Sequence, residues 1–259
     1  MGKFDGVLIC SDFDGTIFNG QEVPSEAREA IEAFMAEGGK FCICSGRGPE
    51  FLRDMAHFIR GNTYSICHGG AIITDIWSGD TLKDEFVDDE AFLVLEDVLN
   101  SEAKTVKINI MRPAGVIDRY TPKEYFKNKE TISRDAYKIT LNGATDADGA
   151  LYVKYAKEHP SENYTLARSF SSYIEILKTA NTKGYGAKLL KKHLGARLLV
   201  AMGDYENDFA LFESADVSFA VANAIPELKS MATHILSRTV NECAVIEAID
   251  FIEKNYLNK

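Results

Sequence analysis

The chain has 259 residues, of which 46% are hydrophobic, enough apolar material for one large domain or two smaller ones. Its formal net charge of -10 argues against general nucleic-acid binding, which needs a basic face, although a metal ion and local cations could still attract a small anion into one pocket. No apolar run is long enough to span a membrane, so we expect no membrane partner.

The amino-terminal segment and the cysteines bear on the cellular compartment. The apolar run from Val7 to Cys10 is short for a secretory signal and lacks a small-residue cleavage site. The cysteines are odd in number and no pair has zinc-finger spacing, so we interpret them as buried, reduced thiols: Cys10, Cys42, Cys44, Cys67 and Cys243. The sequence therefore predicts a cytoplasmic protein.

The first third of the chain alternates predicted strands with predicted helices. Apolar runs at 7–10, 41–44 and 65–67 are typical of strands that are buried on both faces. Apolar residues recur with helical spacing over 25–37, and a second helix is predicted over 49–59. This order predicts a parallel sheet with helices on both faces, which binds its ligands beyond the carboxyl ends of the strands.

The pattern changes after about residue 81. Val106, Ile108 and Ile110 alternate with polar residues, as do the apolar residues of 137–141, so these strands should have one wet face. Helices are predicted over 88–99 and 146–159, and a further strand over 173–177. These elements predict a separate α+β unit on a half-exposed sheet.

The first pattern resumes near Lys183. A helix to Gly195, buried strands at 198–202 and 217–221, and a helix from about residue 242 complete it. The predicted fold is therefore α/β, with a doubly wound, parallel-sheet (Rossmann-like) core at 1–82 and 180–259. The α+β unit at 83–179 is inserted into that core.

Acidic residues follow the first and fourth predicted core strands. Asp12 and Asp14 end one of them, and Asp204 and Asp208 follow the other. Carboxylates crowded at one sheet edge repel one another unless a hard cation neutralises them, and oxygen-only ligands favour Mg²⁺. Because residues two apart in an extended segment point the same way, Asp12 and Asp14 could serve as nucleophile and general acid/base.

Other residues nearby suit a phosphate group. Gly15 lets the backbone turn so that N–H groups face an anion, and the Thr16 hydroxyl could orient a neighbouring carboxylate. Ser45 and the backbone N–H of Gly46 could bind a phosphate oxygen, and Lys183 could supply a positive charge.

Each of these residues also has a purely structural interpretation. The aspartates could be turn residues, Ser45 a helix cap, and Lys183 a solvated helix residue. Arg47 could steer an anion or form a surface salt bridge, and His68 could be a loop residue or touch the substrate. Arginines of the inserted unit that could contact a leaving group are Arg112, Arg119 and Arg134.

Four motifs in order resemble those of the haloacid dehalogenase-like (HAD) hydrolases. They are Asp12-Phe13-Asp14-Gly15-Thr16, Ser45-Gly46-Arg47, Lys183-Gly184 and Gly203-Asp204-Tyr205-Glu206-Asn207-Asp208. The insertion between the second and third motifs resembles a C2-type cap of the sugar-phosphatase (Cof-like, subfamily IIB) branch. The resemblance covers nearly the whole chain. It departs at His68-Gly69-Gly70, where the branch often has Asn-Gly, and at Asn241-Glu242-Cys243-Ala244, where it has a glycine.

The resemblance implies a role for each matching residue. Asp12 would carry the phosphoryl group, while Asp14 would protonate the leaving oxygen and then activate water. Mg²⁺ would bind the Asp12 and Asp204 carboxylates and the Asp14 carbonyl. Ser45, Lys183 and Asn207 would hold the phosphate. Asp208 would bind a metal-bound water or anchor Lys183.

The expected function is that of a Mg²⁺-dependent phosphatase. It would hydrolyse small phosphorylated metabolites, such as sugar phosphates, through an aspartyl-phosphate, with the cap as a lid. The alternatives are a phosphotransferase or sugar phosphomutase with the same nucleophile, and a non-catalytic phosphometabolite sensor. The presence of both Asp12 and Asp14 argues against the sensor.

Overall fold

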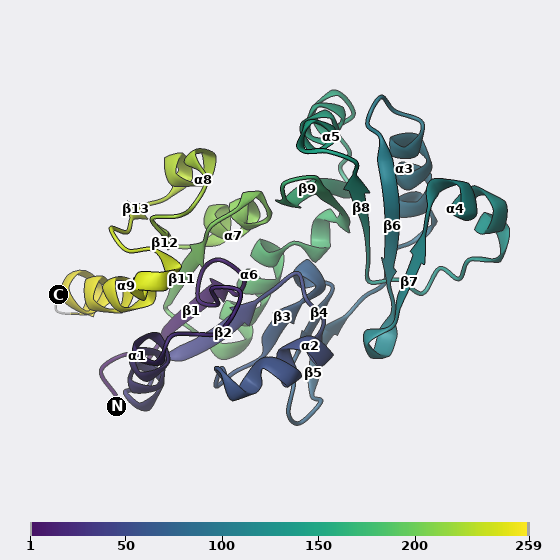
Figure 1. Ribbon diagram of the computed structural model, residues 1–259. Coiled ribbons are helices and arrows are strands. Elements are labelled where there is room, and N and C mark those ends of the chain that lie inside the picture. Colours follow the sequence, from purple (N-terminus) through teal and green to yellow (C-terminus); the bar gives the residue numbers. More distant parts are fainter. Residues whose placement is uncertain (1, 258–259) are drawn as a thin grey trace.

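The larger unit is built on an eight-stranded sheet in the computed structural model, which describes residues 2–257 (Figure 1). In chain order its strands are β1 (Val7–Asp12), β2 (Lys40–Cys44), β3 (Ser65–Cys67), β4 (Ile72–Thr74), β5 (Thr81–Asp84), β11 (Leu198–Gly203), β12 (Val217–Ala220) and β13 (His234–Ile235). They pair in the order β13-β12-β11-β1-β2-β3-β4-β5. The strands from β13 to β3 are parallel, whereas β4 and β5 extend the sheet in antiparallel fashion. The structure confirms the predicted α/β core.

Helices cover the core sheet on both faces. They are α1 (Ser25–Ala36), α2 (Pro49–Asp54), α6 (Lys183–Leu194), α7 (Phe209–Ser214), α8 (Pro226–Met231) and α9 (Ala244–Ile252). Strand order runs in opposite directions on the two sides of β1, so right-handed crossovers place α1 and α2 on one face and α7 and α8 on the other. The second helix is shorter than predicted. It ends at Asp54, because the Asp54 carbonyl accepts a hydrogen bond from the His57 ring and a 3₁₀ turn follows.

The reversal of strand order places a crevice at one edge of the sheet. β1 lies between β11 and β2, and all six of its residues are buried. Asp12 is its last residue, and Asp204 directly follows β11. Open α/β sheets bind their ligands at such a switch point, so the topology alone brings these two carboxylates together.

The smaller unit is an α+β cap between β5 and α6. Its strands are β6 (Thr105–Met111), β7 (Ile117–Tyr120), β8 (Lys138–Gly143), β9 (Tyr164–Phe170) and β10 (Tyr173–Lys178), and its helices are α3 (Asp89–Leu99), α4 (Pro122–Asn128) and α5 (Asp146–Glu158). The strands pair antiparallel in the order β7-β6-β8-β10-β9. Ile108, Ile139 and Ile174 belong to a hydrophobic cluster that is separate from the core cluster.

Two short linkers join the cap to the core and are tied to one another. Lys178 Nζ donates to Glu85 Oε1 at 3.0 Å, and Lys83 Nζ donates to the Ala180 carbonyl at 2.5 Å. Because β5 pairs within the core sheet and ends at Asp84, we propose that the cap spans about residues 85–179, a boundary slightly later than the sequence suggested.

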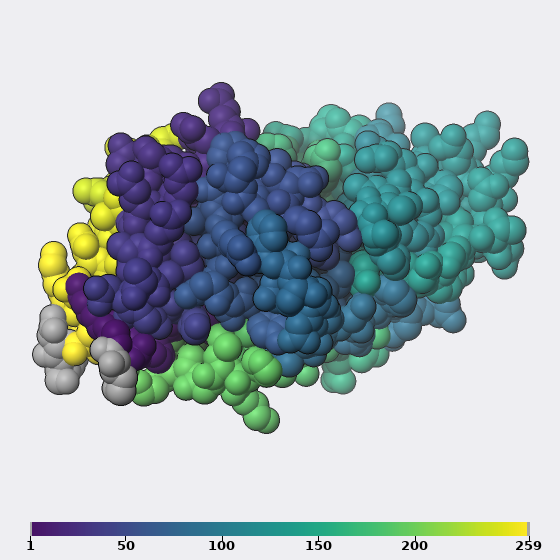
Figure 2. All heavy atoms as spheres, turned by 90° about the horizontal axis from the view of Figure 1, so that it is seen from below, coloured from purple at the N-terminus to yellow at the C-terminus, as the bar shows by residue number. Residues whose placement is uncertain are grey.

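The surface view shows how distant parts of the chain adjoin. The first and last segments, purple and yellow, meet at one end of the molecule, and the teal cap segments form the other end (Figure 2). Within residues 2–257, no helix has the length and apolar character needed to cross a bilayer.

Candidate active site

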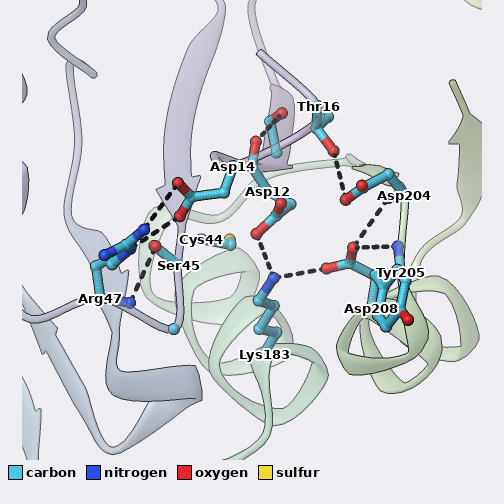
Figure 3. Close-up of polar contacts among 12 residues, drawn as sticks. Asp12, Asp14, Thr16, Cys44, Ser45, Arg47, Lys183, Asp204, Tyr205 and Asp208 are labelled. Carbon is cyan, nitrogen blue, oxygen red and sulfur yellow. Dashed lines mark hydrogen bonds and ion pairs between the residues drawn. The ribbon is translucent and has the colours of Figure 1, made fainter. Parts of the chain in front are cut away.

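Functional side chains converge where β1, β11 and α6 meet (Figure 3). Asp12 ends β1, and Lys183 is the first residue of α6, whose start is capped by the Thr182 hydroxyl. Gly15 has φ +82°, and a Cβ on it would collide with the Asp204 carboxylate. A glycine is therefore required at position 15, where the first acidic motif packs against Asp204 of the second.

Lys183 lies at the centre of the site. Its ammonium group donates to Asp12 Oδ1 and, at 2.7 Å, to Asp208 Oδ1. Its side chain is only 1% exposed. Burial lowers the pKa of Lys183, but the carboxylates of Asp12 and Asp208 outweigh burial and raise it above the usual value. The lysine is therefore a fixed positive charge beside Asp12, and the interpretation as a solvated helix residue does not fit its position.

Asp208 acts on the geometry of its neighbours. While Oδ1 accepts from Lys183, Oδ2 accepts backbone N–H groups of Asp204 at 3.0 Å and Tyr205 at 3.3 Å. The Thr16 hydroxyl donates to Asp204 Oδ1 at 3.3 Å. Two roles were predicted for Thr16: contact with the phosphate, and orientation of a neighbouring carboxylate. In the structure its hydroxyl has the second role.

The donor set fits a hard cation. Carboxylate oxygens of Asp12, Asp204 and Asp208 lie within 4.8 Å of one another. Burial, with Asp208 next, raises the pKa of Asp204 to about 7, and burial likewise raises the pKa of Asp12 although Lys183 opposes it. The crowded negative charge is thus costly, and a divalent cation would relieve that cost. Since hydrogen bonds engage both Asp208 oxygens, Asp12 and Asp204 are the better candidates for direct ligands.

Asp14 points away from this cluster toward Arg47. The Arg47 Nε and Nη2 atoms donate to the two Asp14 oxygens at 3.1 and 3.2 Å. Both side chains are partly exposed, and the guanidinium also lies 4.4 Å from the centre of the Phe51 ring. Asp14 therefore reaches the same cavity as Asp12 but is held by a different cation.

The predicted phosphate-binding residues are placed unevenly. Gly46 and Asn207 line the cavity beside Asp12. Ser45 is fully buried behind it, and its Oγ accepts the Arg47 backbone N–H at 3.0 Å. The serine thus shapes the turn that carries Gly46 and Arg47.

The cavity lies between core and cap and has a volume of about 640 Å³. Strand alternation explains the cap's contribution, because Ile139 faces the cap core while Lys138 and Thr140 face the cavity. Lys138 Nζ donates to Glu175 Oε1 and to the Gly46 carbonyl, both at 2.8 Å.

Sequence reasoning did not select these cap residues. Asn109, Lys138, Thr140, Tyr173 and Glu175 line the cavity. The predicted arginines Arg112, Arg119 and Arg134 do not line it. The alternation of apolar and polar residues in the cap strands was a signal that could have found the lining residues, since the polar face of each strand turns toward the core.

His68 lies behind the cavity at the junction with the cap. Its ring stacks on Tyr137 with centroids 5.1 Å apart, and it is 5% exposed. Neither ring nitrogen has a hydrogen-bond partner. Burial, followed by the nearby Lys138, lowers the pKa of His68 to about 3. The imidazole is therefore a neutral packing group at the pH at which most enzymes work.

Comparisons with known proteins agree with this fold and site. Residues 9–249 match the model of a haloacid dehalogenase-like hydrolase family. Bacillus subtilis YxeH, provisionally named a phosphatase, is 28% identical over 93% of this chain and 96% of its own length. Phosphoglycolate phosphatase 2 of Saccharolobus solfataricus is 25% identical over 95% of this chain and 92% of its own. The HAD subclass IIB sugar phosphatase BT4131 aligns with a TM-score of 0.74 and 19% identity over 95% of this chain and 98% of that structure.

The fold, with an acidic cluster at its switch point and an inserted cap, defines a capped α/β hydrolase. The chain belongs to the haloacid dehalogenase-like hydrolases. The predicted family and the predicted enzyme class, a phosphatase, are thereby confirmed.

Proposed function

We propose that the enzyme is a Mg²⁺-dependent phosphatase of small phosphorylated metabolites, working through an aspartyl-phosphate on Asp12. The observation that supports this most directly is the buried Lys183, which donates to both Asp12 and Asp208. Asp12 and the neighbouring Asp204 themselves line the cavity. A buried cation and a metal site on either side of one carboxylate are what an anionic nucleophile needs when it meets an anionic phosphate.

Asp12 would attack phosphorus through Oδ2, because Lys183 already occupies Oδ1. Lys183 offsets the negative charge on Asp12 and would remain near the transferring oxygens. When bound to Asp12 and Asp204, Mg²⁺ would supply further charge neutralisation for the phosphoryl group.

Asp14 would move protons in both halves of the reaction. It lines the cavity beside Asp12, as a group that protonates the leaving oxygen must. Its ion pair with Arg47 is partly exposed, so an arriving phosphate could compete for the guanidinium and release the carboxylate. Arg47 would then bind substrate, and Asp14 could subsequently activate water.

The cap end of the cavity favours a neutral, hydroxyl-bearing leaving group. Its volume of about 640 Å³ suits a small metabolite. Lys138 is already bound to Glu175 and Gly46, and Asn109 and Thr140 are uncharged hydrogen-bonding groups. A sugar phosphate fits this lining better than phosphoglycolate, whose carboxylate would meet the Glu175 carboxylate.

A phosphate-release assay tests the proposal. The substrates would include sugar phosphates, phosphoglycolate, nucleotides and cofactor phosphates, each with and without Mg²⁺. We expect Mg²⁺-dependent release that Asp12→Asn reduces by at least about a thousandfold, because the nucleophile is lost. Asp250→Asn, a matched change at an exposed position on α9, should behave like the wild type.

Two results would contradict the proposal. Phosphate release that survives Asp12→Asn would exclude the aspartyl-phosphate. If folded, metal-loaded protein released no phosphate from any ester, hydrolysis would be excluded and transfer to an added sugar acceptor would be tested next.

A further inference from the structure

The cap touches the acidic loop of the core at a point away from the linkers. Arg168 on β9 donates to Glu206 Oε1 through Nε at 2.9 Å, and its Nη2 lies 2.6 Å from the same oxygen. The two side chains are 24% and 14% exposed, so the pair is largely removed from solvent. Glu206 lies between Asp204 and Asp208, in the turn that follows β11.

A second contact fixes the neighbouring residue of the same turn. The Ser171 backbone N–H, at the tip of the β9–β10 hairpin, donates to the Tyr205 hydroxyl at 3.1 Å. Ser171 has a backbone φ of +29°, which is uncommon for a residue other than glycine, so the hairpin turn has an unusual conformation. The Arg168 guanidinium also lies 5.7 Å from the centre of the Tyr205 ring.

Hydrogen bonds from the core also hold the turn that contains Tyr205 and Glu206. Asp208 Oδ2 accepts the backbone N–H groups of Asp204 and Tyr205, and Asp208 Oδ1 accepts from Lys183. The backbone of the turn is therefore bound by the core, whereas the side chains of Tyr205 and Glu206 are bound by the cap. Asp204 begins the turn that both sets of contacts bind.

We propose that Arg168 is a positioning residue that couples docking of the cap to metal binding. With the cap docked, the Arg168–Glu206 and Ser171–Tyr205 contacts hold the turn so that Asp204 faces Asp12. The metal binds this arrangement more tightly than one in which the turn is free. Linkage requires the reverse as well, so the metal must favour the docked cap. The coupling rests on the proposed function only for the identity of the ion.

Charge reversal separates this coupling from simple electrostatics. Arg168→Glu places an additional negative charge near the metal site, which on charge alone would strengthen Mg²⁺ binding. The coupling predicts the opposite, because two carboxylates would then repel each other and release the turn. The double variant Arg168→Glu/Glu206→Arg restores an ion pair with the wild-type net charge.

Titration calorimetry with Mg²⁺ and no substrate gives the test. We expect Arg168→Glu to raise the Kd for Mg²⁺ by about fivefold or more and the double variant to recover most of that loss. Arg134→Glu, which breaks the Arg134–Asp89 pair within the cap, is the matched control and should leave the Kd unchanged. Unchanged or tighter Mg²⁺ binding by Arg168→Glu would overturn the proposal.

Hydrogen exchange of the wild type tests the reverse direction without any variant. Added Mg²⁺ should slow amide exchange in the β9–β10 hairpin at least severalfold, and exchange there that ignores Mg²⁺ would refute the coupling. These outcomes are independent of substrate. If the linkage held and no phosphate ester were hydrolysed, the proposed function would fail while the coupling stood.

Discussion

At the scale of single residues, the site depends on buried charges that satisfy one another. Lys183 is stable in the interior because two carboxylates accept from it, and Asp208 is stable because Lys183 and two backbone N–H groups donate to it. Asp12 shares the same lysine, so its second oxygen stays available for chemistry. The Lys183 side chain thereby stabilises the buried site and also holds the proposed nucleophile, Asp12.

His68 offers a test of burial at one residue. Its pKa is lowered to about 3, so the imidazole stays neutral in the folded protein while it binds a proton in the unfolded chain below pH 6.5. The contribution of the neutral His68 ring to the free energy of unfolding is thus fully present above pH 6.5 and is lost as the pH falls toward 3. Between pH 7.5 and 5.5 the wild type should lose about 1 kcal/mol through this residue.

The matched variant is His68→Asn, which lacks a titrating ring and tolerates the φ of +49° at this position. Its free energy of unfolding in urea should fall less between pH 7.5 and 5.5 than that of the wild type, by about 1 kcal/mol. Equal pH dependence in the two proteins would show that His68 is accessible to protons in the fold.

The sequence was informative about residues that end core strands. Asp12, Asp14 and Asp204 could be located because a doubly wound sheet brings the ends of its strands to one edge. Lys183, which begins α6, could be located from its motif. Arg168 and Glu206 could not, since their pairing depends on how the cap docks, and no local pattern encodes that. Arg112 was named for its charge, yet it is buried in ion pairs with Asp118 and Asp135 inside the cap.

At the scale of elements, two cap strands reach the cavity between the cap and the core. Lys138 on β8 and Glu175 on β10 form an ion pair with side chains 3% and 6% exposed, and Lys138 also holds the Gly46 carbonyl. The second oxygen of Glu175 is buried without a partner. The cost of removing Lys138 and Glu175 from water is therefore nearly equal to the attraction between them.

Removing one partner should be far worse than removing both. We expect Lys138→Met to lower the free energy of unfolding by about 3 kcal/mol, because the Glu175 carboxylate would be left buried and unpaired. The double variant Lys138→Met/Glu175→Leu should recover most of that loss. Urea unfolding measures both, with Lys154→Met in an exposed pair as a control that should change little. A double variant as unstable as the single one would contradict this account.

The elements themselves were predictable to different degrees. The long buried strands and the alternating strands of the cap carry clear hydrophobic periods, and the structure has strands at those places. β4 and β5 have only three and four residues, and no strand was predicted there. Their antiparallel pairing places residues 83 and 84 in the core sheet, which is why we propose a cap that begins slightly later than residue 83.

At the scale of the whole molecule, the chain has two hydrophobic cores. The cap cluster includes Tyr125 and Tyr152, and it is distinct from the cluster under the core sheet. Contacts between the units are mainly polar, including Lys138 with Gly46 and Arg168 with Glu206. Apart from Tyr137, which packs in the core cluster, such an interface can open without exposing either core, as a lid over an active site requires.

This division predicts that the cap folds by itself. A fragment spanning residues 85–179 contains all five cap strands, all three cap helices and the complete cap cluster. We expect a cooperative urea transition and dispersed amide resonances, since the contacts that the fragment loses are mainly polar and the packing of Tyr137 against the core is an exception.

A shorter fragment supplies the control. Residues 85–159 lack β9 and β10, and β10 lies inside the cap sheet between β8 and β9. Its absence would expose Ile139 and Leu141 and leave a row of unpaired backbone groups along β8, so this fragment should remain unfolded. If the longer fragment bound hydrophobic dyes and melted without cooperativity, the cap would depend on the core for its structure. The polar interface would then be part of the folding unit, and opening of the lid would have to be a smaller movement confined to the β9–β10 hairpin.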